Sequence, residues 1–211
     1  MKKYLLFILF LFSFSTLVHA EQYKEGVNYA AIEPQPTETG KNIEVLEFFW
    51  YGCPHCYHFE PYISQWNKTK PANVTFIRIP AVFRPSWKVQ ARAYYALLDM
   101  GVIEQVHDKI FDAIHKNHQR LDTEHDMANF LATQGIDKQK FIEAYNSFSV
   151  DTQMRKGIKK LTAYKVDGVP AVFVNGKYKL SGQMAGSYEN LIKILNYLIK
   201  KESKHTSASK R

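Results

Sequence analysis

The chain has 211 residues, of which 45% are hydrophobic and 23% charged, and this length and composition suit one well-buried domain or a domain with an insertion. Its formal net charge is +8 at pH 7, but the basic side chains are scattered and gather mainly at 200–201 and in the polar stretch 203–211. Because the sequence has no basic stripe with interleaved aromatic residues, it argues against nucleic-acid binding, and the positive charge favours at most a weak attraction to an anionic membrane surface.

Residues 1–20 have the pattern of a secretory signal peptide. Two lysines near the start are followed by the apolar run 5–12, and Val18-His19-Ala20 offers a small-x-small cleavage site. An uncleaved membrane anchor is the less favoured alternative, because the apolar run is short for a membrane span. No later segment is apolar enough to cross a membrane. We therefore expect an exported protein in an oxidising compartment, where a pair of cysteines can persist as a disulfide.

The first block after this leader, residues 21–81, predicts a strand, a helix and a second strand. The β-branched and aromatic run 43–49 predicts the first strand, residues 54–66 the helix, and residues 74–79 the second strand. Two strands joined by a helix lie parallel in one sheet. A short earlier strand is expected near residues 27–30.

Between residues 82 and 165 the apolar residues recur at helical spacing and strand signals disappear, which predicts an all-helical insertion. Gly101 ends the first of its helices, Thr123 caps a later one that Gly135 ends, and Asp137 caps the next. The expected helices cover residues 87–100, 103–114, 124–133, 137–145 and 150–164.

The last structured block, residues 166–201, predicts a hairpin and a terminal helix. Asn175-Gly176 lies between the runs 171–174 and 177–180, and Asn-Gly between apolar runs is the strongest short hairpin signal. The apolar positions of the terminal helix are Leu191, Ile194, Leu195 and Leu198. We expect residues 202–211 to form a flexible basic tail.

Cys53-Pro54-His55-Cys56 contains both cysteines of the chain. The pair straddles the junction between the first strand and its helix, with Pro54 at the first helical position. Because the first N–H groups of a helix lack internal partners, a thiolate on Cys53 is stabilised there. Cys56 lies one turn further into the helix, close enough to form a disulfide with Cys53. His55 can stabilise the Cys53 thiolate further, which makes the oxidised pair a stronger oxidant.

Strand-helix-strand followed by hairpin and helix, with C-x-x-C after the first strong strand, resembles the thioredoxin-like arrangement. The predicted fold is therefore α/β, a βαβ unit plus a ββα unit with the helical insertion between them. Pro170 directly precedes a predicted strand, where it marks an edge, a turn or a special peptide bond. In thioredoxin-like proteins this proline lies beside the cysteines, so the resemblance predicts a cis Val169-Pro170 bond that faces them and leaves the backbone of Val169 free to pair with an extended substrate.

The resemblance becomes specific when both motifs are taken together. Glu47, Phe48-Phe49, Cys53-Pro54-His55-Cys56, Tyr57 and the stretch 168–178 closely resemble the DsbA family of bacterial periplasmic thiol:disulfide oxidases. The signal peptide and the helical insertion agree with this family, so the resemblance covers nearly all of the chain after residue 20. It implies a periplasmic enzyme without cofactor or metal that donates its disulfide to newly exported, cysteine-containing proteins. It also implies reoxidation by a quinone-linked inner-membrane protein such as DsbB.

Carried over to this sequence, the family's catalytic residues would be Cys53 as the nucleophile with a strongly lowered pKa, Cys56 as its resolving partner, and Pro54 and His55 between them. Val169 and Pro170 would bind the substrate. Glu47 would be the buried acid beneath the disulfide that helps to move protons, with Arg78 as a candidate partner on the neighbouring strand. An ordinary carboxylate on the face of a strand remains the alternative for Glu47, and a side chain that extends to solvent remains the alternative for Arg78. Trp50 and Tyr51 either wall a groove for unfolded chains or pack against the insertion.

Several other functions compete with a disulfide oxidase. A disulfide isomerase or reductase is the nearest alternative, but isomerases of this type carry a dimerisation domain and little sequence precedes the first strong strand, so a monomeric oxidase is favoured. A metal site made by Cys53, His55, Cys56 and His58 is the alternative from another class. His58 lies about 140° around the helix from Cys53, which argues against this site. A permanent structural disulfide would gain little, because the loop it closes is short.

The remaining histidines lie in the predicted insertion. We interpret them as surface residues of its helices; they include His107, His115, His118 and His125.

Overall fold

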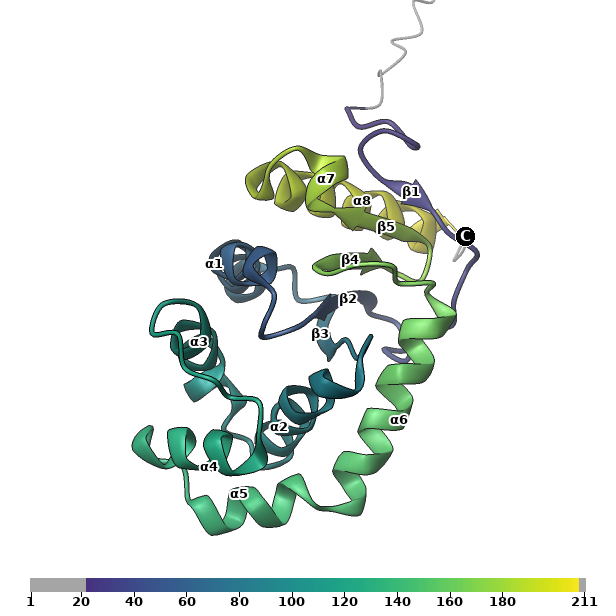
Figure 1. Cartoon of the computed structure of the whole chain (residues 1–211). Helices are drawn as coiled ribbons and strands as arrows, with labels where there is room; N and C mark the ends of the chain where they lie inside the picture. The colour runs from purple at the N-terminus through teal and green to yellow at the C-terminus, as the bar shows by residue number, and fades with distance from the viewer. Residues whose placement is uncertain (1–21, 209–211) are drawn as a thin grey trace, which may run out of the picture.

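The computed structural model describes residues 22–208, so the predicted signal peptide lies outside the described residues. A mixed sheet with the strand order β1-β5-β4-β2-β3 forms the centre of this part of the chain (Figure 1). Only β2 and β3 are parallel, and the other neighbours are antiparallel. The strands are β1 (Ala30–Ala31), β2 (Ile43–Phe49), β3 (Val74–Pro80), β4 (Ala171–Val174) and β5 (Tyr178–Ser181).

The predicted βαβ unit is confirmed. β2 has the predicted bounds, and α1 (Pro54–Thr69) connects it to β3. The early strand begins later than the predicted residues 27–30. Val27 is 57% exposed, and only Ala30 and Ala31 reach the edge of β5 to pair with it. The position of this short strand thus depends on a pairing partner that is distant in the sequence.

An all-helical insertion follows β3, as predicted. It starts with a short 3-10 turn, η1 (Pro85–Trp87), so the first helix begins one residue later than expected. The last helix begins at Phe148, because Ser147 caps it by accepting a hydrogen bond from the N–H of Val150. Figure 1 shows α2 to α5 grouped beyond the sheet, and α6 running from them back to it. The helices are α2 (Lys88–Asp99), α3 (Ile103–His115), α4 (Glu124–Thr133), α5 (Lys138–Tyr145) and α6 (Phe148–Ala163).

The predicted hairpin is also present. Asn175 and Gly176 have φ values of 51° and 65°, as a two-residue hairpin turn of this type requires. A Cβ atom on Gly176 would lie 2.1 Å from the carbonyl oxygen of Gln35, so the turn also needs glycine for space. The unpredicted short helix α7 (Gly182–Ala185) follows β5 and ends at Gly186, where φ is 77°.

The terminal helix α8 (Tyr188–Ala208) buries its four predicted apolar positions. The expectation of a flexible tail is wrong for residues 202–208, because α8 continues to Ala208; residues 209–211 lie outside the described residues. Glu202 is buried and accepts hydrogen bonds from Asn175 and Lys177 of the hairpin turn. These contacts hold the helix against the sheet beyond the predicted end.

The two faces of the sheet are covered by different elements. Val45 packs with side chains of α1 and α8, whereas Leu46 and Phe48 pack with Tyr164 just after α6. Because side chains alternate along a strand, Glu47 lies on the same face as Val45, beneath α1. An ionisable side chain is thus built into the buried centre of the molecule.

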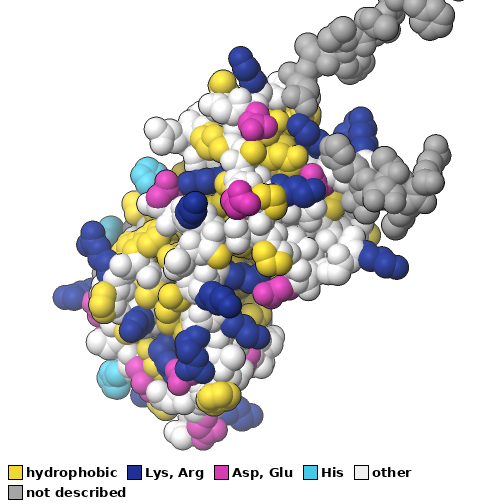
Figure 2. All heavy atoms as spheres, turned by 90° about the vertical axis from the view of Figure 1, so that its right-hand side faces the viewer, with side chains coloured by type: hydrophobic (Ala, Val, Ile, Leu, Met, Phe, Trp, Pro, Cys, Tyr) yellow, Lys and Arg dark blue, Asp and Glu magenta, His cyan; other side chains and the backbone are white. Residues whose placement is uncertain are grey.

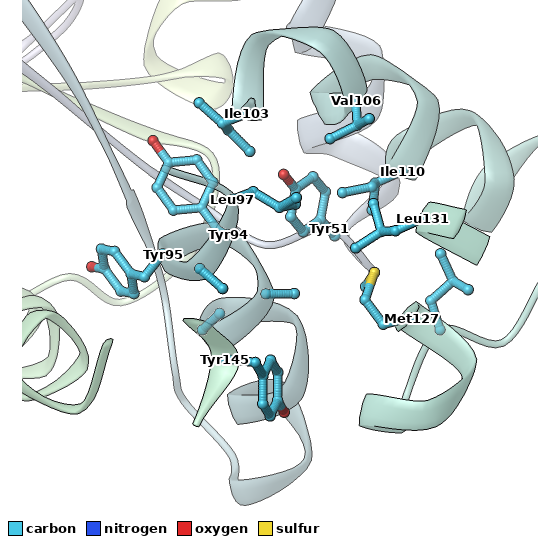
Figure 3. Packing of buried hydrophobic residues seen from close by; sticks show 14 of the residues in the cluster. Tyr51, Tyr94, Tyr95, Leu97, Ile103, Val106, Ile110, Met127, Leu131 and Tyr145 are labelled. Atoms are coloured by element: carbon cyan, nitrogen blue, oxygen red, sulfur yellow. The ribbon is translucent and has the colours of Figure 1, made fainter. Parts of the chain in front are cut away.

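The insertion has its own hydrophobic core, which also includes the active-site segment. Figure 3 shows Tyr51 packed among side chains of the insertion helices. Phe49, Cys53 and Cys56 belong to the same cluster. Its other labelled members are Tyr94, Tyr95, Leu97, Ile103, Val106, Ile110, Met127, Leu131 and Tyr145.

The surface agrees with the scattered charge of the sequence. Figure 2 shows the right-hand side of Figure 1, where basic, acidic and apolar side chains are interspersed without a continuous basic stripe on this face. Among residues 22–208, no helix combines the length and the apolar character that a membrane span requires.

Candidate active site

The cysteine pair lies where β2 passes into α1, as predicted. Cys53 caps the helix with extended backbone angles (φ −88°, ψ 116°), and Pro54 occupies its first turn. The N–H of Cys56 donates to Sγ of Cys53 over 3.4 Å. Both cysteines are free thiols. The start of the helix therefore directs a backbone donor at the first sulfur of the pair.

The two sulfurs differ strongly in their affinity for a proton. A hydrogen bond from the Cys56 thiol, with the N–H groups of Cys56 and His55 and the charge of His55, lowers the pKa of Cys53 from 9.0 to about 6, although burial acts in the opposite direction. Burial and the neighbouring Cys53 raise the pKa of Cys56 far above that of an ordinary thiol. Negative charge therefore resides on Cys53, the residue at the surface side of the pair.

The residues before the pair pack tightly against the insertion. The Trp50 ring stacks on Trp87 with 3.8 Å between ring centroids and 6° between planes. A Cβ atom on Gly52 would lie 2.3 Å from the Trp50 ring, so glycine is needed where the chain turns toward Cys53. Tyr51 is 1% exposed. Of the two alternatives considered for Tyr51, packing against the insertion is the one observed.

The predicted second motif faces the cysteines. The Val169-Pro170 peptide bond is cis, and the thiol of Cys53 donates to the carbonyl oxygen of Val169 over 3.4 Å. A cavity of about 900 Å³ begins beside this contact and is lined by residues that include His55, Val169, Pro170 and Tyr188. Two neighbours of Cys53, His55 in the sequence and Val169 across the contact, thus line this cavity.

Tyr188, which the sequence analysis missed, connects α8 to the active-site turn. Its hydroxyl donates to the carbonyl oxygen of His55 over 3.0 Å. Its ring lies 3.1 Å from the position that a Cβ atom on Gly182 would occupy, so the small residue at 182 leaves room for it. No periodic or motif signal singles out this tyrosine in the sequence.

Glu47 and Arg78 form the predicted pair. They are opposite each other in the register of β2 and β3, and Nε of Arg78 lies 3.1 Å from Oε2 of Glu47. Arg78 also binds a second buried acid, since its Nη2 lies 2.5 Å from Oε1 of Glu60. Glu60 was missed, although it lies four residues after Cys56, a spacing that places both side chains on one face of α1.

One guanidinium therefore faces two carboxyl groups, and the pKa values of the two acids separate. Burial raises the pKa of Glu47 from 4.5 to about 8, and the charge of Glu60 adds to this effect against the attraction of Arg78. Glu60 is buried as well, but hydrogen bonds from His107 and Ser64 and the charges of His107 and Arg78 lower its pKa. Glu47 is thus the acid that keeps its proton near neutral pH. It lies near Cys56, and a negative charge on Glu47 would raise the pKa of Cys56.

The interpretation of the insertion histidines as surface residues is wrong for His107. It is 3% exposed, because it shares the buried face of α3 with Ile103, Val106 and Ile110. That apolar spacing was present in the sequence and could have revealed it.

The other three histidines have different environments. His115 is half-buried, stacks on Tyr57 and lies 2.7 Å from the carbonyl oxygen of Tyr51 through its Nε2. His118 is exposed in the loop after α3, so its predicted place on a helix is wrong, and His125 is exposed on α4 as predicted.

The proposed metal ligands do not converge. Cys56 is buried, whereas His55 and His58 are exposed. Within residues 22–208, no group of three or more histidine, cysteine, aspartate or glutamate side chains is arranged to hold a metal ion.

Comparison with known proteins gives the same result. Residues 44–193 match the DSBA-like thioredoxin domain family. The chain is 46% identical to the thiol:disulfide interchange protein DsbA of Pseudomonas aeruginosa over 190 residues, 90% of each protein. It is 47% identical to the protein of the same name from Azotobacter vinelandii over 167 residues, 79% of this chain and 78% of the relative.

Solved structures agree in fold as well as in sequence. The crystal structure of Pseudomonas aeruginosa DsbA superposes with a TM-score of 0.85 at 46% identity and covers 91% of this chain and 99% of that one. The oxidoreductase DsbA from Xylella fastidiosa superposes with a TM-score of 0.77 at 30% identity, over 84% of this chain and 96% of that one. The predicted thioredoxin-like fold is confirmed. The chain therefore belongs to the DsbA family of thiol:disulfide interchange proteins and is a thiol:disulfide oxidoreductase.

Proposed function

We propose that Cys53 and Cys56 form the disulfide that this oxidoreductase donates to newly exported proteins. The observation that carries the proposal is the asymmetry of the two sulfurs, since the pKa of Cys53 is about 6 and that of Cys56 is strongly raised. A thiol that prefers to be ionised stabilises the reduced pair, so the oxidised pair readily accepts two electrons.

The reaction takes place in two exchanges. A substrate thiolate attacks Sγ of Cys53, the bond between the two cysteines breaks, and its electron pair leaves on Cys56. The second thiolate of the substrate then attacks the substrate sulfur that is bonded to Cys53. A disulfide forms within the substrate, and Cys53 is released as a stable thiolate. The substrate gains a disulfide, and the enzyme retains two electrons as a dithiol.

The other residues of the site support these exchanges. His55 and the helix start, with Pro54 in its first turn, stabilise the Cys53 thiolate. The neutral Glu47 supplies the proton that Cys56 needs as it leaves, because a thiolate is costly at a site that is 1% exposed. Val169 and Pro170 pair with the extended substrate, whose flanking residues have room in the cavity beside His55.

Membership of the DsbA family supports the partners and the compartment that we propose. The enzyme acts on unfolded, cysteine-containing proteins in the periplasm, where its signal peptide directs it. A quinone-linked inner-membrane protein of the DsbB kind removes the two electrons and restores the disulfide. The enzyme works as a monomer and uses no cofactor of its own.

The test is a redox equilibrium with glutathione, read by mass spectrometry of the alkylated cysteines. We expect the mixture to contain mainly reduced enzyme and oxidised glutathione even when little reduced glutathione is present. Oxidised enzyme that persists in excess reduced glutathione would identify a reductase instead. The cysteine roles are tested by trapping: Cys56→Ser should accumulate substrate proteins on Cys53, and Cys53→Ser should accumulate none. Equal adducts in both variants would contradict the assignment.

A further inference from the structure

A line of buried polar side chains connects the insertion to the acids beneath the cysteines. The hydroxyl of Tyr51 lies 2.7 Å from Nδ1 of His107, and Nε2 of the same imidazole lies 3.3 Å from Oε2 of Glu60. Glu60 in turn shares Arg78 with Glu47. His107 is the one member of this line that the insertion contributes, and the exchange reaction described above does not use it.

The two acids receive unequal numbers of hydrogen bonds. Glu60 accepts from Arg78 at 2.5 Å, from the hydroxyl of Ser64 at 2.6 Å and from His107. Glu47 accepts from Nε of Arg78, and its Oε1 is buried without a hydrogen-bond partner among the described residues. Because hydrogen bonds stabilise the ionised form of a carboxyl group, Glu60 carries the negative charge and Glu47 the proton.

The hydroxyl of Tyr51 orients the imidazole. Burial raises the pKa of Tyr51 well above its ordinary value, so the hydroxyl keeps its proton and can donate it to Nδ1. With Nδ1 accepting from Tyr51, Nε2 carries a proton and donates to Glu60. Tyr51 is 1% and His107 3% exposed, and Figure 3 shows the Tyr51 ring among apolar side chains of the insertion, so this contact lies away from solvent.

We propose that His107 is a positioning residue for proton transfer: its hydrogen bond keeps Glu60 ionised, so that Glu47 remains the protonated acid beneath Cys56. The inference rests on the proposed function for the use made of that proton. When Cys56 leaves the disulfide, its thiolate takes the proton of Glu47, and the Glu47 carboxylate that remains lies beside Arg78. Without the hydrogen bond from His107, Glu60 would compete with Glu47 for the same proton.

Other ionisable groups surround this line and have to be considered in any titration. Glu104 and Asp108 are exposed on α3, where solvent screens their charges. The groups that act on the line from each neighbouring element are Glu60 of α1, Arg78 of β3, Tyr94 of α2, and Glu104 and Asp108 of α3. A substitution at position 107 leaves both carboxylates on α3 in place. A difference in the titration of Glu47 between such variants therefore reports the missing hydrogen bond to Glu60.

The experiment follows the carboxylic acid band of Glu47 by infrared spectroscopy across pH in the oxidised protein, with Glu47→Gln to assign the band. In His107→Leu we expect the midpoint to fall by about one pH unit, a tenfold change in proton affinity. His107→Gln can still donate an N–H to Glu60 and should restore a midpoint near that of the unmodified protein. His115 contacts the carbonyl oxygen of Tyr51 but does not contact Glu60, so His115→Leu should leave the midpoint unchanged.

Three results would overturn the proposal: an unchanged midpoint in His107→Leu, an equal fall in His107→Gln, or an equal fall in His115→Leu. If His107→Leu does not fold, ¹⁵N NMR of the His107 imidazole in the unmodified protein shows whether Nε2 carries a proton. A protonated Nε2 supports the proposal, and a bare Nε2 facing Glu60 contradicts it. Failure of the proposed function is separate, because it would appear as the absence of substrate adducts on Cys53 in Cys56→Ser while the Glu47 midpoint still moved.

Discussion

Two identical side chains three positions apart on one helix have opposite properties in this enzyme. Cys53 lies at the helix start, where backbone N–H groups and His55 favour its thiolate, whereas Cys56 is 1% exposed and lies near a buried acid. The difference arises from position, since the residue type is the same. Replacing a neighbour should therefore change the pKa of Cys53 without altering the fold.

His55→Ser tests this statement. Because the charge of His55 helps to lower the pKa of Cys53 while the backbone N–H groups remain in the variant, we expect the pKa to rise from about 6 by up to about one unit. The absorbance of the thiolate against pH measures it. His58→Ser, which replaces an exposed histidine of the same helix, serves as the control. An equal rise in both variants would contradict a specific effect of His55.

Glu47→Gln tests the second perturbed group. The pKa of Glu47 is raised from 4.5 to about 8, so the folded protein keeps a proton that the unfolded chain loses between these values. The free energy of unfolding should therefore fall by at least about 1 kcal/mol as the pH rises from about 4.5 to 8. Glu47→Gln should remove this dependence on pH.

Urea unfolding of the oxidised protein is the suitable measurement for Glu47→Gln, because neither cysteine titrates there. If the free energy of unfolding depended on pH in the same way in the variant and in the unmodified protein, Glu47 would be ionised throughout this range.

At this scale the sequence predicted the residues whose neighbours are close along the chain. Cys53, Pro54 and Cys56 have their predicted places because a strand, a turn and a helix start are local features. The apolar spacing of α3 could have shown that His107 is buried, but its partners, Tyr51 and Glu60, are reached only after the insertion folds over α1. Proton sharing between two acids and one arginine likewise depends on a three-dimensional arrangement of strands and helices.

Within the insertion, α6 packs closely against α2. A Cβ atom on Gly157 would lie 2.4 Å from the hydroxyl oxygen of Tyr95, but 3.4 Å from the nearest atom of Ile79. The tyrosine hydroxyl is therefore the main obstacle to a larger residue at position 157.

Gly157→Ala should thus destabilise the protein by about 1–3 kcal/mol through overpacking, despite the better helix propensity of alanine. In the background of Tyr95→Phe the same substitution should be neutral or stabilising, because the obstructing oxygen is gone. Denaturant unfolding of both single variants and the double variant gives the coupling energy. Additive effects would show that the contact does not limit the approach of the two helices.

Element prediction succeeded where a local pattern is strong. β2, the Asn175-Gly176 turn and the capped helices α4 and α5 agree with the sequence analysis because each has a turn residue or a cap of its own. β1 and the end of α8 differ, because their limits depend on pairing with β5 or on the burial of Glu202 against the hairpin. Such contacts connect residues that are distant in the sequence.

For the whole molecule, the state of the cysteines is coupled to stability. In the reduced protein the pKa of Cys53 is lowered from 9.0 to about 6, so the unfolded chain binds more protons between these values, and stability rises with pH across this window. The gain is complete above the pKa of the unfolded thiol and disappears as pH falls through about 6. The disulfide offers little compensation, because it closes a very short loop.

We therefore expect the reduced protein to unfold at a higher denaturant concentration than the oxidised protein at pH 7. The difference should shrink as the pH approaches 5. Guanidinium unfolding of both forms at several pH values measures it. A more stable oxidised form at pH 7 would argue against a disulfide donor.

The most direct test of the account is the rate of alkylation of Cys53 by iodoacetamide as a function of pH in the reduced enzyme. We expect a midpoint near pH 6 and little reaction at Cys56. A midpoint near 8.5, the value of an ordinary cysteine, would contradict the claim that the fold places negative charge on Cys53.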